Sequence, residues 1–242
     1  MAPDRAEQAI ITGVSRGIGE IIARFLLKKG WTVHGLSRGE PGTRDPQLRW
    51  HRADLGNAAE IDRVLGGLAG PFDCVVLNAG MLGPMGKSLE IPLAGWRETF
   101  DLNFFAPLAF TRALLPKCRS NACFIFLSGG GAVTPLAGVG PYALSKLAIV
   151  KLVEQLSLEE SRARFYAMAP GAVDTEIFRE HHARSGGAMP RFTEAGEIEC
   201  LVERFLLDTD RKLNGKLVHV RDDIAKLLSV PDGGFVRRME AR

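Results

Sequence analysis

A tyrosine and a lysine four residues apart could move a proton. Tyr142 and Lys146 belong to the segment Tyr-Ala-Leu-Ser-Lys, and residues at this spacing share one face of a helix. A free tyrosine has a pKa of about 10, and a nearby cation favours the phenolate. Lowering that pKa by about three units requires roughly 4 kcal/mol of differential stabilisation. The spacing therefore predicts an acid/base pair, although by itself it also fits an ordinary surface pair.

A glycine-rich turn near the start could bind a phosphate. Residues 12–19 read Thr-Gly-Val-Ser-Arg-Gly-Ile-Gly, between a β-branched run and an amphipathic segment. In a strand-to-helix turn, glycines allow backbone N–H groups and the helix N-terminus to approach a pyrophosphate. The context predicts a dinucleotide site, and the alternative is a tight turn with no ligand.

The end of the second predicted strand bears on the type of dinucleotide. An acidic side chain there would bind a ribose 2′-hydroxyl and repel a 2′-phosphate. This chain has Ser37 and Arg38 instead, and Arg16 of the glycine turn could approach from the other side. A guanidinium suits a phosphate, so the sequence favours NADP(H) over NAD(H). Glu40 lies close enough to keep NAD(H) possible, and both arginines could instead be solvated surface residues.

These residues must be positioned by strands and helices that alternate along the chain. The predicted strands are almost entirely apolar, which is typical of strands covered on both faces, and most are separated by segments with helical spacing. The fold class is therefore α/β, with a parallel sheet of about seven strands and helices on both faces. The predicted strands are Gln8–Thr12, Trp31–Leu36, Leu48–Arg52, Cys74–Leu77, Cys123–Leu127, Phe165–Ala169 and Lys216–Val220.

Two connections depart from this regularity, within what we expect to be a single domain over residues 1–242. Gly39–Gln47 is short and contains two prolines, so a loop must replace the usual crossover helix. A long polar segment follows the sixth strand, and we expect a substrate lid at about residues 174–196. About residues 221–242 form a C-terminal extension, with a helix predicted at Ile224–Leu228.

Composition excludes several classes of protein. The 242 residues are 46% hydrophobic and 24% charged, which excludes disorder, collagen and a disulfide mini-protein. The 31 basic and 28 acidic residues are mixed along the chain, so neither nucleic acid nor a membrane is an expected partner. Ser120 to Ser145 is uncharged but broken by glycine and proline, which predicts a buried strand and a loop. The four cysteines lack metal-ligand spacing, so we expect reduced core thiols, no metal site and a cytoplasmic protein.

Taken together, these segments resemble the compact single-domain branch of the short-chain dehydrogenase/reductase family. The resemblance depends on the order and spacing of six motifs over nearly the whole chain. They are the glycine turn at residues 12–19, Asp54-Leu55, Asn78-Ala79-Gly80, Asn103, the Tyr142/Lys146 pair, and the segment Pro170-Gly171-Ala172-Val173-Asp174-Thr175. It implies a Rossmann-type doubly wound fold and an NADP(H)-dependent carbonyl reductase or alcohol dehydrogenase, acting on a small ketone or secondary alcohol as a homodimer or homotetramer.

The resemblance also implies catalytic roles. Tyr142 is the general acid/base, Lys146 lowers its pKa and binds the nicotinamide ribose, and Asn103 holds a water that links Lys146 to solvent. A serine after the fifth strand orients the substrate oxygen in this family, but Gly129 occupies its usual position here. We expect Ser128 to fill that role through the flexibility of the following glycines. The alternatives are a vacant position or, more weakly, Thr134.

The implied cofactor site extends over most of the motifs. Asp54 should bind the adenine, Asn78 should stabilise the sheet beside the cofactor, and Val173–Thr175 should hold the nicotinamide and phosphate end. The full set of predicted cofactor-binding residues is Gly13, Ser15, Arg16, Gly17, Ile18, Gly19, Ser37, Arg38, Asp54, Leu55, Asn78, Ala79, Gly80, Tyr142, Lys146, Pro170, Gly171, Val173 and Thr175.

Two other functional classes remain as alternatives. A nucleotide-sensing or scaffold protein would keep the fold but have lost turnover, which the uncertain serine allows. Asn103, Tyr142 and Lys146 argue against it, because a binding module needs no proton path. A nucleotide-sugar epimerase or dehydratase of the extended branch fits poorly, because that branch needs a larger C-terminal substrate domain than 242 residues provide.

Overall fold

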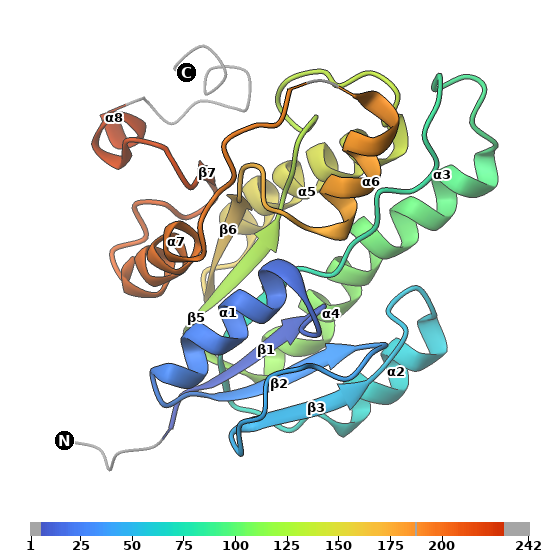
Figure 1. The fold of residues 1–242 in the computed structure, drawn as a ribbon. Helices are drawn as coiled ribbons and strands as arrows, with labels where there is room; N and C mark the ends of the chain where they lie inside the picture. The colour runs from blue at the N-terminus through green and yellow to red at the C-terminus, as the bar shows by residue number, and fades with distance from the viewer. Residues whose placement is uncertain (1–5, 187, 230–242) are drawn as a thin grey trace.

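A seven-stranded parallel sheet lies at the centre of the computed structural model, which describes residues 6–186 and 188–229 (Figure 1). Its strand order is β3-β2-β1-β4-β5-β6-β7, and each neighbouring pair is parallel. The order reverses direction beside β1, which produces the doubly wound arrangement that the sequence predicts. The strands are β1 Gln8–Thr12, β2 Thr32–Ser37, β3 Leu48–Arg52, β4 Phe72–Leu77, β5 Cys118–Leu127, β6 Ala163–Ala169 and β7 Leu217–His219.

All seven predicted strands are present, and β1 and β3 have the predicted bounds. The largest difference is β5, which begins at Cys118, five residues before the apolar run. Its first residues include the exposed Arg119 and Ser120, so hydrophobicity could not mark this start. The prediction of a strand and loop over Ser120–Ser145 is confirmed, since β5 ends at Leu127 and a loop leads to the next helix.

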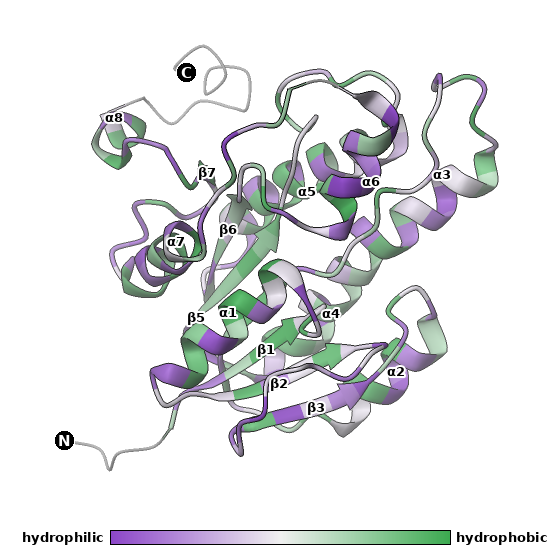
Figure 2. Cartoon of the chain, in the orientation of Figure 1, coloured by the Kyte–Doolittle hydropathy of each residue, from purple (hydrophilic) through white to green (hydrophobic). Residues whose placement is uncertain are grey.

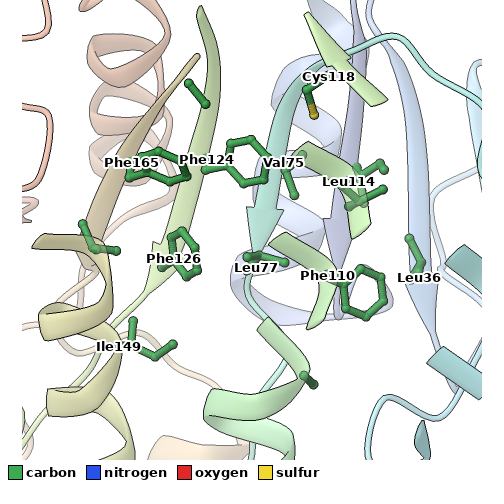
Figure 3. Close-up of a cluster of buried hydrophobic side chains, with 14 of the residues drawn as sticks. Leu36, Val75, Leu77, Phe110, Leu114, Cys118, Phe124, Phe126, Ile149 and Phe165 are labelled. Atoms are coloured by element: carbon green, nitrogen blue, oxygen red, sulfur yellow. The ribbon is translucent and has the colours of Figure 1, made fainter. Parts of the chain in front are cut away.

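Helices cover both faces of the sheet and bury two separate cores. On one face lie α2 (Ala58–Gly67), α4 (Ala106–Leu114) and α5 (Gly140–Glu159). Figure 3 shows part of this core, to which Phe110 of α4, Ile149 of α5 and the aromatic side chains of β5 all contribute. On the other face lie α1 (Gly17–Lys28) and α7 (Ala195–Leu207). Burial on both faces explains why the inner strands are apolar throughout, whereas edge strand β3 is more polar (Figure 2).

The remaining helices lie outside these two layers or interrupt them. A long helix is built from α3 (Leu93–Phe100), a π-helical turn over Asp101–Phe105, and α4, before a 3₁₀ turn over Leu115–Lys117. The predicted lid segment contains α6 (Glu176–Ser185), and the predicted C-terminal helix is α8 (Ile224–Ser229). Residues 230–242 of the predicted extension lie outside the described residues. The prediction of a loop over Gly39–Gln47 is confirmed.

Over residues 6–186 and 188–229, no helix combines the length and the apolar character that a transmembrane span requires.

Candidate functional site

A buried hydrogen-bond network joins the carboxyl ends of β1 and β4. The Thr12 hydroxyl accepts from the backbone N–H groups of Asn78 (2.9 Å) and Ala79 (3.0 Å). In the other direction, Asn78 Nδ2 donates to the carbonyl oxygens of Thr12 (2.9 Å) and Gly13 (3.2 Å). Asn78 thus ties the two strands together directly beside the glycine turn, which is where the sequence predicts that it acts.

The glycine turn packs too tightly for side chains. A Cβ at Gly19 would lie 2.2 Å from the carbonyl oxygen of Gly13, and Gly13 itself has φ +72° with Asn78 Nδ2 2.8 Å from its would-be Cβ. Ser15 and Ile18 are half-buried beside them. Within the described part of the chain no side chain caps α1, whereas Asn57 caps α2. The first N–H groups of α1 therefore lack a side-chain acceptor, as a phosphate-binding helix end requires.

Ser37, Arg38 and Arg16 are predicted to favour NADP(H) over NAD(H), and each has different surroundings in the structure. Ser37 is buried, and its hydroxyl donates to Gly39 O (2.7 Å) and accepts from Trp50 Nε1 (3.1 Å). The structure thus uses this hydroxyl inside the fold, because β3 places Trp50 beside it. Arg38 is exposed and has no ion pair among residues 6–186 and 188–229. Arg16 pairs with Glu176 at the start of α6.

The acidic residues that follow β2 and β3 also have partners: Glu40 forms an ion pair and Asp54 accepts a hydrogen bond. Glu40, which keeps NAD(H) possible, pairs with the exposed Arg44. After β3, Asp54 Oδ1 accepts from Gly56 N (3.0 Å), and Asp54 N donates to Glu60 Oε2 (2.9 Å). Leu55 beside it is buried in the core. Asp54 thus has a fixed, half-buried position at the end of the strand.

Tyr142 and Lys146 lie in the first two turns of α5. Lys146 is buried, its Nζ donates to Leu127 O at 2.9 Å, and it lies 5.8 Å from the centre of the Tyr142 ring. Burial lowers the pKa of Lys146 to about 8 and raises the pKa of Tyr142 to about 12. In the chain without a nucleotide, burial therefore favours the protonated phenol at neutral pH, and the lowered pKa expected with a bound cofactor stays a prediction.

Asn103 is positioned by the π-helical turn between α3 and α4. Its Nδ2 donates to Met81 O (2.9 Å) and Ser145 Oγ (3.0 Å), and its Oδ1 accepts from Met81 N (2.9 Å). A Cβ on Gly80 would lie 3.1 Å from this Oδ1 and 3.3 Å from Lys146 Nζ. Gly80 therefore allows Asn103 and Lys146 to meet at the end of β4. The side chain of Asn103 bridges the loop after β4 to α5.

Among the described residues, no hydrogen bond joins the serine of the loop after β5 to the phenol. Ser128 is buried, and its hydroxyl is directed at Lys146 O, 3.5 Å away. Gly129 packs against the phenol, since a Cβ on it would be 2.3 Å from Tyr142 Oη. Thr134 is exposed farther along the loop. The role predicted for Ser128 stays a prediction, and this geometry favours the alternative of a vacant position.

The segment after β6 meets the glycine turn. Pro170 and Val173 are buried, and Gly171 has φ +70° with Thr193 Oγ1 2.6 Å from its would-be Cβ. The Thr175 hydroxyl caps α6 by accepting from Phe178 N, and its methyl group would be 3.2 Å from a Cβ on Gly17. The structure thus brings residues 170–175 against residues 13–19, as the predicted site requires.

Comparisons with known proteins agree with this arrangement. Residues 7–185 match the model of the short chain dehydrogenase family. The chain belongs to the short-chain dehydrogenase family. An uncharacterized oxidoreductase of Saccharomyces cerevisiae is 32% identical over 183 residues, which are 69% of this chain and 71% of that protein. A benzil reductase ((S)-benzoin forming) of Bacillus subtilis is 28% identical over 212 residues, which are 81% and 87% of the two chains.

A solved structure shows the same fold. The short-chain dehydrogenase family protein of Francisella tularensis superposes with a TM-score of 0.79 at 25% identity, covering 89% of this chain and 97% of that one. The protein is therefore an NAD(P)-dependent oxidoreductase of the short-chain dehydrogenase family with a Rossmann-type fold.

One feature of the site escaped the sequence prediction. The pair between Arg16 and Glu176 has no signal in the sequence, because 160 residues separate its members. The vacant position at Gly129, by contrast, is one of the alternatives that the sequence leaves open. The prediction of four core cysteines is correct for Cys74, Cys118 and Cys123 but wrong for Cys200, which is exposed on α7.

Proposed function

We propose that this protein is an NADP(H)-dependent reductase of ketones, with Tyr142 as the proton donor. The observation that carries the proposal is the position of the Tyr142 phenol. It is protonated and only partly buried, and it lies on the same sheet edge as the buried Lys146 and the glycine turn. A protonated phenol is the form needed to reduce a carbonyl, because the oxygen of the product alcohol requires a proton.

Tyr142, Lys146 and Asn103 would each have a separate role in the proton transfer. Tyr142 Oη donates its proton to the carbonyl oxygen as the carbon accepts hydride, so that an alcohol and a phenolate result. The Lys146 ammonium, 5.8 Å from the centre of the Tyr142 ring, can stabilise that phenolate by its charge, and the proton that restores the phenol would reach it through a bridging group. Asn103 fixes the loop after β4 against α5, and its remaining acceptor capacity can hold the water that recharges Lys146.

The residues present fit a dinucleotide. The uncapped N-terminus of α1 and the glycine turn would hold the pyrophosphate, Asp54 the adenine end, and Val173–Thr175 the nicotinamide end. When bound, NADP(H) supplies or accepts the hydride. The exposed Arg38 is available for a 2′-phosphate, and Arg16 can reach one by releasing Glu176. Arg38→Ala should therefore weaken NADPH about tenfold relative to NADH in a fluorescence titration.

Substituting the two tyrosines of the chain tests the catalytic proposal. Tyr142→Phe should lower kcat/KM for NADPH-dependent reduction of benzil by about 100-fold or more, while NADPH affinity stays near that of the wild type. The control is Tyr166→Phe, which removes a buried hydroxyl bonded to Asp208 Oδ2 at 2.9 Å on the other core. It should destabilise the fold yet preserve turnover.

The competing function is a protein that binds the nucleotide without turning it over. Gly129 favours it to the extent that a substrate-orienting hydroxyl is missing beside Tyr142. NADPH binding with no Tyr142-dependent oxidation across aryl, alicyclic and acyl ketones would establish that alternative. We further propose a homodimer or homotetramer in the cytoplasm, where the four free thiols would stay reduced.

A further inference from the structure

Arg221 begins the predicted C-terminal extension, two residues after the end of β7. Its Nη2 donates to the carbonyl oxygen of Arg191 (3.2 Å) and to Thr193 Oγ1 (3.4 Å), and its Nε donates to Glu197 Oε1 (3.4 Å). Arg191 and Thr193 belong to the segment that leads from α6 to α7, and Glu197 lies in the first turn of α7 (Figure 1). One guanidinium thus joins the end of β7, the end of the predicted lid segment and the start of α7.

Thr193 carries this support to the segment after β6. Thr193 is buried, and its backbone N–H donates to the carbonyl oxygen of Ala172 at 2.7 Å. Its hydroxyl oxygen lies 2.6 Å from the position that a Cβ on Gly171 would take. Two consecutive residues of the segment after β6 are therefore held against Thr193, whose hydroxyl is the acceptor for Arg221.

His219 of β7 contacts the same glycine. Its Nε2 lies 3.3 Å from the would-be Cβ of Gly171, and its Nδ1 accepts a hydrogen bond from the backbone N–H of Arg221 at 3.1 Å. The backbone N–H of Val220 also donates to Ala169 O at 3.1 Å, which continues the pairing of β6 and β7 up to this point. The backbone around Gly171 is thus packed by two side chains, and both of them bind Arg221.

Glu197 fixes the guanidinium in its turn. Its Oε2 accepts from the backbone N–H of Glu194 (2.9 Å) in the capping box of α7, and its Oε1 faces Arg221. Only 35% of the Arg221 side chain and 25% of the Glu197 side chain are exposed, so this is not a fully solvated surface pair. A guanidinium has five donors in one plane and can therefore serve several acceptors at once, which the single ammonium of a lysine does less well.

We infer that Arg221 is a positioning residue for the nicotinamide end of the cofactor site. It acts through Thr193 on the backbone of residues 170–175. The inference rests on the proposed function, which assigns part of that segment to the nicotinamide end of the dinucleotide. A hydride donor must be held in a narrow geometry relative to the carbonyl carbon, so a small displacement of this backbone is costly.

Ligands with and without nicotinamide separate this role from general support of the fold. NADPH and 2′-phospho-ADP-ribose share the adenine, the phosphates and both ribose groups, and only NADPH carries the nicotinamide ring. In calorimetric titrations, Arg221→Gln should weaken NADPH about fivefold and change the affinity for 2′-phospho-ADP-ribose by less than about twofold. NADH and ADP-ribose give the same comparison if the chain prefers NAD(H). Equal changes for both ligands of a pair, or no change for either, would overturn the inference.

An arginine of the predicted lid segment provides the matched control. Arg184→Gln removes a guanidinium that pairs with Glu180 at 3.3 Å, within α6. This variant should leave both affinities near the wild-type values. If it caused the same selective loss as Arg221→Gln, a looser lid segment would be the cause and the assignment to Arg221 would be wrong.

Variants of Thr193 test the route and do not require that Arg221→Gln folds. Thr193→Val removes the hydroxyl that accepts from Arg221 and should cause the same selective loss of NADPH affinity, whereas Thr193→Ser keeps the hydroxyl and should retain most of the affinity. Adding Arg221→Gln to Thr193→Val should cause little further loss, because both changes break one connection. Fully additive losses would refute the route through Thr193.

Turnover distinguishes this inference from the proposed function. With NADPH and benzil, Arg221→Gln should lower kcat by about tenfold and change KM for benzil by less than about threefold. A selective loss of NADPH affinity without any Tyr142-dependent turnover in the wild type would support the positioning role and refute the proposed catalysis. Tyr142-dependent turnover together with equal changes for NADPH and 2′-phospho-ADP-ribose would refute the positioning role alone. A wild-type chain that binds neither NADPH nor NADH would refute both.

Discussion

The carboxyl edge of the sheet has two halves that are held in different ways. At the ends of β1 and β4, where we place the cofactor, Thr12 and Asn78 form a closed set of hydrogen bonds between strands. After β5 and β6, where we place the substrate, the described contacts of the loop and of α6 are mainly apolar packing and exposed ion pairs. The first half is fixed by buried polar geometry, and the second depends on contacts that solvent weakens.

One glycine in each half of this edge, Gly19 and Gly129, packs closely against a different kind of neighbour. Gly19 packs against the backbone carbonyl of Gly13, which cannot move without displacing β1. Gly129 packs against the end of one side chain, Tyr142 Oη. The first glycine is needed for the fold to close, whereas the second lets the phenol of Tyr142 pack against the backbone of the loop after β5. The proposed cofactor half thus depends on contacts within the backbone, and the proposed substrate half on contacts with side chains.

The largest effect should come from a methyl group in the tight turn. Gly19→Ala should lower the free energy of unfolding by about 3 kcal/mol, because its Cβ overlaps Gly13 O. Gly66→Ala is the control, since it lies in α2 with nothing within 4 Å of its Cβ, and it should raise stability by about 0.5 to 1 kcal/mol. Urea denaturation measures both, and equal stabilities of Gly19→Ala and wild type would refute the tight packing.

The next effect tests the hydrogen bonds between β1 and β4. Asn78→Ala should lower the free energy of unfolding by about 2 kcal/mol, because it leaves buried carbonyls without donors. NADPH affinity should fall with it, since the glycine turn loses its support. Asn57→Ala, which removes the cap of α2, should lower stability by about 1 kcal/mol but leave NADPH affinity unchanged. A loss of affinity in both variants would mean that general destabilisation is the cause.

Acid should destabilise the cofactor half. His34 on β2 is buried, its Nδ1 lies 3.2 Å from His51 Nε2, and its Nε2 has no partner among the described residues. Burial, then His51 and Arg49, lower its pKa to about 4. Because the unfolded chain takes up this proton at about pH 6.5, stability should fall by about 2 kcal/mol as the pH drops from 6.5 to 4.

Two substitutions check the origin of that acid response by chemical denaturation at several pH values. His34→Leu should remove most of the decline between pH 6.5 and pH 4, since no group is left there to bind the proton. His182→Gln changes a histidine of α6 that stacks on Phe178, and it should keep the wild-type decline. If His34→Leu also kept it, the acid sensitivity would belong to another group.

The smallest effect is expected in the substrate half. Arg179→Ala removes the pair with Asp174, in which both side chains are more than half exposed. Solvent screens this exposed pair, so Tm should fall by only about 1 °C. A double-mutant cycle with Asp174→Ala measures the coupling, and a coupling as large as the loss in Asn78→Ala would show that this half is held as firmly as the first.

Sequence patterns predicted the features that depend on local chemistry. Apolar runs predicted the seven strands, the two prolines in Gly39–Gln47 predicted the loop, and motif order predicted the strand ends at which the candidate site residues lie. They could not predict where Ser128 or Ser37 would point, because each hydroxyl also meets a group on another element of the fold. Lys146 O lies near the hydroxyl of Ser128, and Trp50 lies near that of Ser37.

The pKa of Tyr142 shows a related limit. The spacing to Lys146 predicts attraction between a cation and a phenolate, which lowers the pKa. Whether the lysine carries its charge depends on burial, which spacing does not reveal. In the folded chain without a nucleotide, burial lowers the pKa of Lys146 to about 8 and raises that of Tyr142 to about 12.

The π-helical turn over Asp101–Phe105 restricts how this chain can vary in evolution. Such a turn holds one residue more than an α-helical turn, and here that residue aligns Asn103 with Met81 and Ser145. Losing a single residue from this turn would make the helix regular and rotate everything on one side of the deletion by about 100°. Homologues that keep the proposed proton relay should therefore accept substitutions at the four positions of this turn other than Asn103 far more readily than a change in the number of residues.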